Sequence, residues 1–559
     1  MYPSALAKRG TVILFIGVAA FFLYGLGQLP LLGPDEPRYA QIGREMFLRG
    51  DLITPTLGGH PWFEKPALLY WMMAASYKLF GVSEWSARLP AAVAGLLTVG
   101  AVFFVGRSVG RRYSTTEEIP MEAWTGRNAC PTGLGFWSAP AAATTLGIVA
   151  FARAASFDII VTMTIAWALA FFLVSDLSES ERPRRRLLLG FYIFVGLSLL
   201  AKGLIGIVIP LGVIGAYSLF RRRLPARRAL MSVWWGIPVS LAVASLWYAP
   251  VIWRHGWPFI DQFFIQHQFA RYVSNKYRHP APVYFYLLIL IPLALPWTAF
   301  IVEGIGRSKP WRRIRAEDPA GKLLNFAFAW LLFPLLFFSF STSKLPGYIL
   351  PVLPALALLA GHRLSQFASR SEEAKWAMRI TVLVSLLLTV ALPVYAWRTG
   401  NPSRVCAGLI AMLLGVAGIF PLISRRRSGA LIVIAAATLG VVLIVLHCWA
   451  PQAVQRQTTK HLLQLADQQG HSQTLIYGLQ RDDRTPEFYA AGRVIYGPDH
   501  EPIMFESQAP VIAESLRRGV PLLVFVRVED LIYVRDGDTA DVDEIGNNGL
   551  LALVAIRAK

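Results

Sequence analysis

Long apolar runs separated by short basic segments constrain this chain more than any other feature. A run that crosses the hydrocarbon core of a bilayer as a helix needs about 17 to 25 residues. We place such runs at 11–32, 84–106, 134–153, 156–175, 187–202, 203–220, 232–253, 283–303, 323–343, 347–363, 378–397, 405–423 and 430–449. Hydrophobic residues make up 55% of the chain and charged residues only 16%. We therefore predict an α-helical polytopic membrane protein with about 13 transmembrane helices.

The basic residues give an independent prediction of topology. Clusters such as Arg184–Arg186, Arg221–Arg223 and Arg425–Arg427 lie in alternate loops. Short loops rich in Lys and Arg stay on the cytoplasmic side, so the loops near 33–83 and 254–282 are predicted to be periplasmic. The net charge of +20 is explained by this arrangement, and no nucleic-acid partner is expected.

The chain is predicted to divide at residue 450. Residues 1–450 form the transmembrane domain, and an odd number of spans puts residues 451–559 on the outer side. This tail has a polar, helix-like stretch over 452–469, followed by short apolar runs separated by polar turns. The runs are 474–477, 493–496, 521–528 and 550–556. They predict a small periplasmic α/β domain that covers the outer face.

The three cysteines add little to the prediction. Cys130, Cys406 and Cys448 show no metal-ligand spacing, and they imply no disulfide framework. Cys406 and Cys448 lie in or beside apolar runs, where a free thiol usually packs as a small apolar group.

The segment Pro34–Ala40 places charged residues at the outer end of the first apolar run. It contains Asp35, Glu36, Arg38 and Tyr39. A carboxylate near a bilayer boundary costs free energy unless it is solvated, paired or bound, so the segment is a candidate functional site. The alternative is an ordinary solvated loop.

Further charged and aromatic residues are predicted at the same side of the membrane. They are Glu64, Lys65, Asp158, Lys202, His267, Arg271, Lys344 and Tyr348. Isolated cations at the ends of different spans would together form a basic pocket suited to a phosphate or diphosphate group. Single lysines at helix ends also reach toward lipid headgroups, which is the alternative explanation for Lys202 and Lys344.

The predicted cytoplasmic loops contain no phosphate-binding loop of the G-x-x-x-x-G-K-[ST] type. The energy for any reaction must therefore arrive with the substrate. This favours a transferase that uses a lipid-activated donor, or a transporter.

Several motifs carry a resemblance to a known family. Pro34–Ala40, Phe63–Pro66, the turn at Asp158, Lys202-Gly203 and Ser343–Tyr348 resemble the bacterial aminoarabinose transferases of lipid A, which belong to the GT-C superfamily of polyprenyl-phosphate-dependent glycosyltransferases. The resemblance covers the membrane part and is weak in the last hundred or so residues. It implies a GT-C fold, a donor of 4-amino-4-deoxy-L-arabinose on undecaprenyl phosphate, and a lipid A phosphate as acceptor. It also implies a Gram-negative inner membrane, a periplasmic active site, and resistance to polymyxin and other cationic peptides.

A sugar on a polyprenyl phosphate leaves with a phosphate dianion, so the reaction needs preorganised cations. We expect Arg38, Lys65, Lys202, Arg271 and Lys344 to bind the donor phosphate. Asp35 and Asp158 are the candidate catalytic acids, and a single displacement with inversion is expected. Tyr39, Glu64 and Tyr348 are the candidate sugar-binding residues, with Glu64 facing the donor's amine.

Glu64 with His267 also forms a weak signal for a divalent cation, because two ligands from distant loops are fewer than a metal site normally uses. No cofactor is otherwise expected. Glu64 could equally pair with Lys65, and His267 could be an ordinary interfacial histidine.

Two other functions fit the same pattern. An enzyme similar to protein O-mannosyltransferases would share the architecture and the acid but would use a hydroxyl acceptor. A lipid-linked sugar transporter or flippase would also have many spans, but it would ordinarily show an internal repeat or charges at the midplane of several helices.

Overall fold

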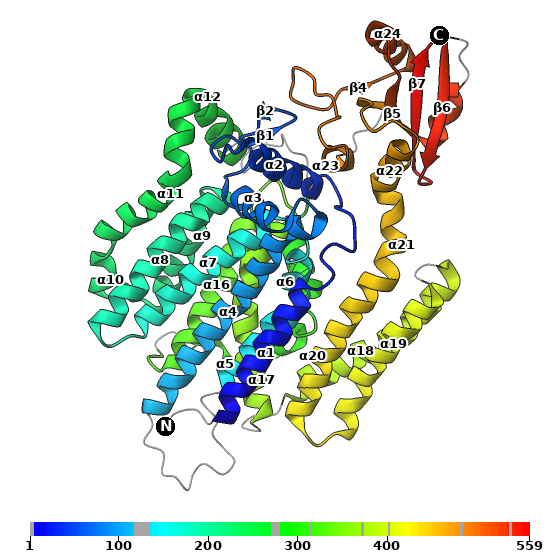
Figure 1. Ribbon diagram of the computed structural model, residues 1–559. Helices are drawn as coiled ribbons and strands as arrows, with labels where there is room; N and C mark the ends of the chain where they lie inside the picture. The colour runs from blue at the N-terminus through cyan, green and yellow to red at the C-terminus, as the bar shows by residue number, and fades with distance from the viewer. Residues whose placement is uncertain are drawn as a thin grey trace.

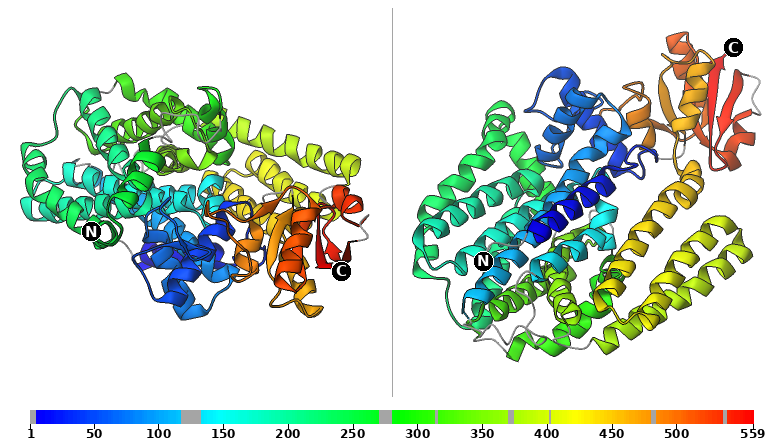
Figure 2. Two further views of the ribbon diagram at one scale, coloured as in Figure 1. Left: turned by 90° about the horizontal axis from the view of Figure 1, so that it is seen from above. Right: turned by 60° about the horizontal axis from the view of Figure 1, so that its bottom comes forward.

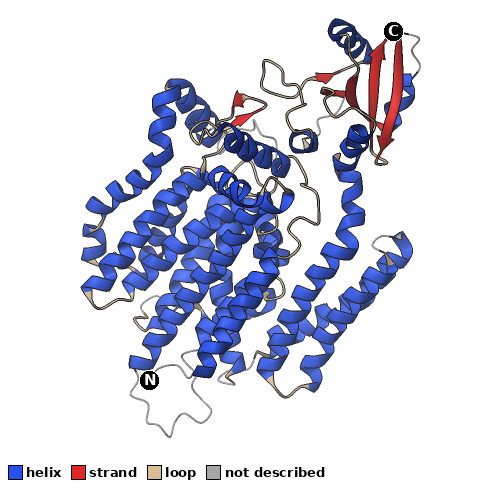
Figure 3. Ribbon diagram, viewed as in Figure 1, coloured by secondary structure: helices blue, strands red, loops and turns tan. Residues whose placement is uncertain are grey.

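The computed structural model describes residues 5–116, 133–269, 280–312, 316–369, 374–400, 403–479, 484–535 and 539–559. Most of these residues form long helices that run side by side, and a small mixed sheet stands beyond one end of them (Figures 1 and 3). The predicted fold class, a helical membrane protein with a small α/β part at its C-terminus, is confirmed.

The helices that overlap the predicted apolar runs range from the six residues of α6 to the 33 of α4. They are α1 (Ala5–Leu23), α4 (Glu84–Thr116), α5 (Gly133–Thr144), α6 (Leu146–Phe151), α7 (Phe157–Asp176), α8 (Glu181–Lys202), α9 (Ile205–Arg221), α11 (Val233–His255), α14 (Phe285–Leu293), α15 (Thr298–Ser308), α16 (Pro319–Ser339), α17 (Leu353–Ala368), α18 (Lys375–Thr399), α19 (Arg404–Ile423) and α20 (Arg427–Ile444). Short helices α10 (Arg227–Met231) and α12 (Trp257–Ile260) and a π-helix, η2 (Asp261–Phe269), flank α11.

Counted by length and apolar composition, the described helices that could span a membrane are fewer than the predicted thirteen. Within the described residues, eight helices are long and apolar enough to cross a membrane, or nine if α14 and α15, which meet at 115°, form one broken span. Helices α1 and α9 are shorter, and α8 carries charges at both ends. The count of thirteen therefore stays a prediction.

Close packing of the helices depends on small residues, as is usual inside membranes. Helix α7 is buried along nearly its whole length. Helices α4 and α5 approach each other through Gly106 and Gly135, and a Cβ on Gly106 would lie 2.9 Å from the Cα of Gly135. Helices α18, α19 and α20 stand to one side of the remaining helices (Figures 1 and 2).

The first outer loop folds into a layer across one end of the helices (Figure 1). It contains α2 (Asp35–Arg49), a hairpin of β1 (Thr56–Leu57) and β2 (His60–Pro61), and α3 (Leu68–Phe80). Gly50 ends α2 in a left-handed conformation with φ of 65°, which glycine adopts at little cost. The hairpin is held to α2 by Glu45, which accepts hydrogen bonds from Gly58 N at 2.8 Å and Thr56 Oγ1 at 2.6 Å.

The C-terminal part is a three-layer α/β structure. Its sheet has the order β4-β3-β5-β7-β6, from β3 (Ile476–Leu479), β4 (Met504–Phe505), β5 (Leu522–Arg527), β6 (Ala540–Asn547) and β7 (Leu551–Ala558). Strand β3 pairs in parallel with β4 and β5, and β7 pairs antiparallel with β5 and β6. Alternate residues of β5 pack against α22 (Lys460–Gln468) on one face and α24 (Gln508–Arg518) on the other.

The structure corrects the prediction of free cysteines. Cys406, near the start of α19, forms a disulfide with Cys448, which follows α20. The two thiols are 42 residues apart in sequence, but the antiparallel packing of α19 and α20 brings them to the same end of the helices. Sequence spacing gave no sign of this pairing. Cys130 lies outside the described residues.

Candidate active site

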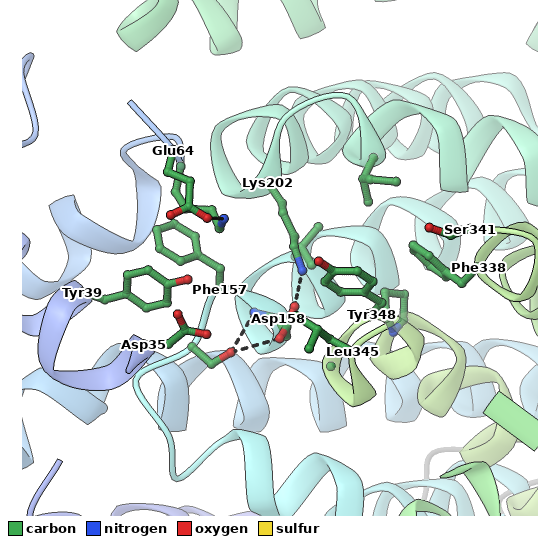
Figure 4. A pocket seen from close by; sticks show the side chains of 16 residues that line it. Asp35, Tyr39, Glu64, Phe157, Asp158, Lys202, Phe338, Ser341, Leu345 and Tyr348 are labelled. Atoms are coloured by element: carbon green, nitrogen blue, oxygen red, sulfur yellow. Dashed lines mark hydrogen bonds and ion pairs between the residues drawn. The ribbon is translucent and has the colours of Figure 1, made fainter. Parts of the chain in front are cut away.

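A cavity of about 140 Å³ lies where the first outer loop meets the ends of the long helices. It is lined by charged, aromatic and small residues from five separate segments of the chain (Figure 4). The charged and aromatic members that sequence analysis singled out are Asp35, Tyr39, Glu64, Lys65, Asp158, Lys202 and Tyr348. These residues lie up to 313 positions apart in sequence, from Asp35 to Tyr348, so the fold gathers the predicted residues into one site.

The adjacent acids Asp35 and Glu36 have different surroundings. Both occupy the first turn of α2, where the helix dipole favours negative charge. Asp35 is exposed, lines the cavity and forms no hydrogen bond or ion pair among the described residues. Glu36 is buried. Asp35 is therefore the carboxylate that is accessible to a substrate.

Glu36 is fully occupied by structural contacts. Its Oε1 accepts hydrogen bonds from Arg88 Nε at 3.0 Å and Ala155 N at 2.6 Å. Its Oε2 accepts from Arg88 at 2.8 Å and Leu32 N at 2.9 Å. Because these partners come from α4, the loop before α7 and the chain before α2, Glu36 joins three segments beneath the cavity.

A second charged cluster lies in the loop between β2 and α3. Lys65 Nζ donates to Glu64 Oε1 at 2.5 Å, and Arg38 lies 3.7 Å from the other oxygen of Glu64. The guanidinium of Arg38 also lies over the ring of Trp62, 5.3 Å from its centroid. Phe63 anchors the loop by packing edge-on against Phe259, with 5.2 Å between the two ring centroids. The loop thus presents Glu64 and Lys65 to the cavity from a fixed position.

The opposite side of the cavity is formed by Asp158, Lys202 and Tyr348 (Figure 4). Lys202, at the end of α8, forms an ion pair with Asp158 in the first turn of α7. The Lys202 ammonium also lies 4.8 Å from the centre of the Tyr348 ring, which is a cation–π contact. Ser156 caps α7 by accepting a hydrogen bond from Asp158 N at 3.1 Å.

Gly347 permits the close approach of the Tyr348 segment to α7. A Cβ at position 347 would lie 2.0 Å from Oδ2 of Asp158, a distance that no real structure accepts. The glycine in the Ser343–Tyr348 motif is therefore required by the geometry of the site.

Tyr39 points into the cavity from α2 and packs edge-on against Phe157, with 4.9 Å between ring centroids. Burial, aided by the negative charges of Asp35 and Glu64, raises the pKa of Tyr39 well above its ordinary value. The phenol therefore stays protonated at physiological pH and can donate a hydrogen bond.

Three of the predicted donor-binding residues do not line the cavity or are not described. Lys344 is buried, and its ammonium donates to the carbonyl of Ser341 at 2.5 Å. Arg38 contacts Glu64 but is not among the residues that line the cavity. Arg271 lies outside the described residues. Their binding roles stay predictions.

The structure does not test the predicted metal pair. The backbone of His267 belongs to η2, but its side chain is outside the described part of the chain. Within the described residues, no group of three or more His, Cys, Asp or Glu side chains could hold a metal ion.

The sequence assigned no role to three residues that support the site, of which Ser156 and Gly347 line the cavity and Arg88 does not. Arg88, Ser156 and Gly347 fix the positions of Glu36, α7 and the Tyr348 turn, respectively. An arginine near the start of the apolar run 84–106 was the one signal available in the sequence. The roles of Ser156 and Gly347 depend on contacts that only the fold creates.

Comparisons with known proteins agree with this arrangement. Residues 64–116 match the family described as dolichyl-phosphate-mannose-protein mannosyltransferase. The undecaprenyl phosphate-alpha-4-amino-4-deoxy-L-arabinose arabinosyl transferase of Erwinia tasmaniensis is 28% identical over 558 residues, covering 94% of this chain and 95% of that protein. The protein of the same name from Aeromonas salmonicida is 28% identical over 408 residues, or 70% of this chain, but the match spans only 64% of that relative's length.

A solved structure is similar over nearly the whole chain. The crystal structure of ArnT from Cupriavidus metallidurans bound to undecaprenyl phosphate matches with a TM-score of 0.77 and 26% identity, covering 98% of both chains. This similarity and the apolar helices show that the chain is a multi-pass membrane protein. The resemblance inferred from the sequence motifs is confirmed.

Proposed function

We propose that this chain, a relative of the undecaprenyl phosphate-aminoarabinose arabinosyl transferases, transfers 4-amino-4-deoxy-L-arabinose from undecaprenyl phosphate to a phosphate group of lipid A. The observation that carries the proposal is the cavity itself. It places the carboxylate of Asp35, which has no ion-pair partner among the described residues, with the cations Lys65 and Lys202 at the end of a membrane helix bundle. A lipid-linked phosphate donor needs such cations where the lipid chain can remain in the bilayer.

Lys65 and Lys202 bind and neutralise the phosphate that leaves with the lipid carrier. Both ammonium groups already pair with a carboxylate, Glu64 and Asp158 respectively. These pairs hold the cations in place before the substrate arrives, and fixed charges in a site with little water stabilise a developing phosphate charge strongly. Arg38, Arg271 and Lys344 are proposed to assist with the same phosphate.

The transfer is a single displacement with inversion at the anomeric carbon. An oxygen of the lipid A phosphate attacks C1 of the sugar, and the bond from C1 to the carrier phosphate breaks with its electron pair on the leaving phosphate. The attacking phosphate is already ionised, so no proton needs to be removed. Asp35 then orients the attack and balances the positive charge that develops on the sugar ring.

Glu64 and the two tyrosines recognise the sugar. The amine of 4-amino-4-deoxy-L-arabinose is cationic, and Glu64 offers a carboxylate to it from the wall of the cavity. Tyr39 and Tyr348 provide aromatic walls, and the protonated phenol of Tyr39 provides a donor. The divalent cation between Glu64 and His267 stays a prediction, and no step above depends on it.

The site is proposed to face the periplasm of a Gram-negative inner membrane. The alternating basic loops support this orientation. The disulfide between Cys406 and Cys448 lies at the end of α19 and α20 that the basic loops assign to the periplasm, and disulfides persist in that oxidising compartment.

A protein O-mannosyltransferase-like activity is the second candidate, because residues 64–116 match that family. Its acceptor would be a hydroxyl group. Asp35 would then act as a general base that removes the hydroxyl proton.

The experiment that tests the proposal uses the purified full-length chain, undecaprenyl phosphate-aminoarabinose and lipid A. Mass spectrometry should detect lipid A that has gained one aminoarabinose. The transfer rate of Lys65→Ala should be lower than that of the wild type by at least about a hundredfold. Lys78→Ala is the matched control, because Lys78 is exposed on α3 and does not line the cavity. Transfer to a peptide hydroxyl but not to lipid A would support the second candidate instead.

A further inference from the structure

The N-terminus of α2, which carries Asp35, has no cap of its own. The residue before the helix is Pro34, whose side chain cannot accept a hydrogen bond from the first turn. The position of Asp35 therefore depends on contacts that other parts of the chain make with this turn. One of them is the contact of Glu36 with Arg88, on the membrane side.

The second contact comes from the C-terminal part of the chain. The short helix α23 (Thr485–Tyr489) lies beside α2 (Figure 1). Tyr489 Oη accepts a hydrogen bond from Leu31 N at 2.6 Å and donates to Glu84 Oε1 at 3.3 Å. Leu32, the next residue, donates its own N–H to Glu36. The amides of Leu31 and Leu32 are thus held by Tyr489 of the C-terminal part and by Glu36 of α2, respectively.

Other contacts join the same two surfaces. Arg44, in the middle of α2, donates to the carbonyl of Phe488 at 3.3 Å. Phe488 is buried in the same apolar core as the membrane helices. Tyr496 packs so closely on the β1–β2 hairpin that a Cβ at Gly58 would lie 2.2 Å from its ring. The contact is therefore an extensive packed surface.

Helix α23 is itself rigidly held. Arg484 donates to Glu487 at 2.9 Å and forms an ion pair with Glu501. The hydroxyl groups of Thr459 and Thr485 are 2.8 Å apart and join α23 to the start of α22. Because α23 is fixed within the C-terminal part, its contact with Leu31 transmits a fixed position to α2.

We infer that the C-terminal α/β part supports the active site from outside the cavity, and that Tyr489 is a positioning residue that sets the place of Asp35 through the Leu31 amide. The inference deepens the proposed function and rests on it for the activity measurement. The effect on α2 itself needs no substrate.

Hydrogen exchange of the purified full-length chain tests the structural half. In Tyr489→Phe, the amides of residues 31–36 should exchange about tenfold faster, because the hydrogen bonds of one hydroxyl are lost while the ring remains. Tyr477→Phe is the matched control, since among the described residues the Tyr477 hydroxyl donates to Glu514, also in the C-terminal part, at 3.2 Å and to no residue of the membrane part. Unchanged exchange in 31–36, or equally faster exchange throughout 460–559, would overturn the inference.

Steady-state transfer assays test the catalytic half. Tyr489→Phe should lower kcat about tenfold and leave KM for the donor within about twofold, because Asp35 is displaced while Lys65 and Lys202 keep their places. Tyr477→Phe should match the wild type. A kcat equal to wild type in Tyr489→Phe would contradict the positioning role. If the wild-type chain transfers no sugar, the proposed function fails, whereas the exchange result still decides whether Tyr489 orders α2.

Discussion

The guanidinium of Arg88 donates hydrogen bonds of 3.0 and 2.8 Å to the two carboxylate oxygens of Glu36. Arg88 also donates to the carbonyls of Leu26, Leu29 and Pro30 at 2.8, 2.6 and 2.7 Å. One buried ion pair therefore organises the whole chain segment that leads into α2. It leaves the neighbouring Asp35 free to face the cavity.

Because Glu36 is a structural residue and Asp35 faces the cavity, replacing each by its amide should have a different effect. Glu36→Gln leaves the buried Arg88 cation uncompensated, which costs about 3 to 5 kcal/mol. The melting temperature of the Glu36→Gln variant in detergent should fall by several degrees. The yield of this variant from membranes should also be low. Asp35→Asn should melt like the wild type but lose transfer activity. Equal melting temperatures for the two variants would contradict the structural role of Glu36.

Gly347→Ala should abolish most activity without affecting the membrane fold. The added methyl group would lie 2.0 Å from Asp158 Oδ2, so the Asp158 carboxylate, which pairs with Lys202 through its other oxygen, must shift. A displacement of about 1 Å in such a site costs about a hundredfold in rate. Gly215→Ala on α9 is the matched control, because no atom lies within 4 Å of its added Cβ. Comparable rates for the two variants in the transfer assay would show that the Asp158 contact is not needed.

Tyr39 should not contribute to the pH dependence of the reaction below pH 10. Burial raises the pKa of Tyr39, so the phenol keeps its proton at every pH below the ordinary tyrosine pKa and loses it only at higher pH. Tyr39→Phe should therefore lower kcat/KM by the same factor at every pH from 6 to about 10. A change in the shape of the profile within this range would mean that the Tyr39 phenol ionises there.

The disulfide predicts how the cysteines respond to labelling in spheroplasts. A membrane-impermeant maleimide should modify Cys448 only after treatment with a reductant, because its thiol is paired with the buried Cys406 and is proposed to face the periplasm. Cys406→Ser should leave the partly exposed Cys448 thiol reactive without reduction, whereas Cys448→Ser should label poorly because Cys406 is buried. Labelling that requires the membrane to be opened would contradict the proposed orientation.

The sequence predicted the positions of the helices better than the number of membrane spans. Apolar length and basic loops located each long helix, because both follow directly from the bilayer. Breaks such as the 115° bend between α14 and α15 depend on packing and are not visible in hydropathy. In the C-terminal part, the runs at 474–477, 521–528 and 550–556 correspond to β3, β5 and β7, whereas the edge strands β4 and β6 are too short or too polar to show the pattern.

The charged residues of the site could be predicted from the sequence motifs. Asp35, Glu64, Lys65, Asp158 and Lys202 all line one cavity. The residues that hold them are less visible, since a glycine, a capping serine or a tyrosine from the C-terminal part has no charge signature. Their roles depend on contacts between segments that are far apart in sequence.

The most direct test of the account is lipid A mass spectrometry in a polymyxin-sensitive strain that makes the aminoarabinose donor. The strain would express the wild-type chain, Asp35→Asn, or the control Asp543→Asn, whose carboxylate is exposed on β6 far from the cavity, at matched membrane levels. We predict that lipid A gains aminoarabinose with the wild type and with Asp543→Asn, and gains none with Asp35→Asn. Unmodified lipid A in the strain with well-expressed wild type, or full modification with Asp35→Asn, would contradict the proposed transfer at this site.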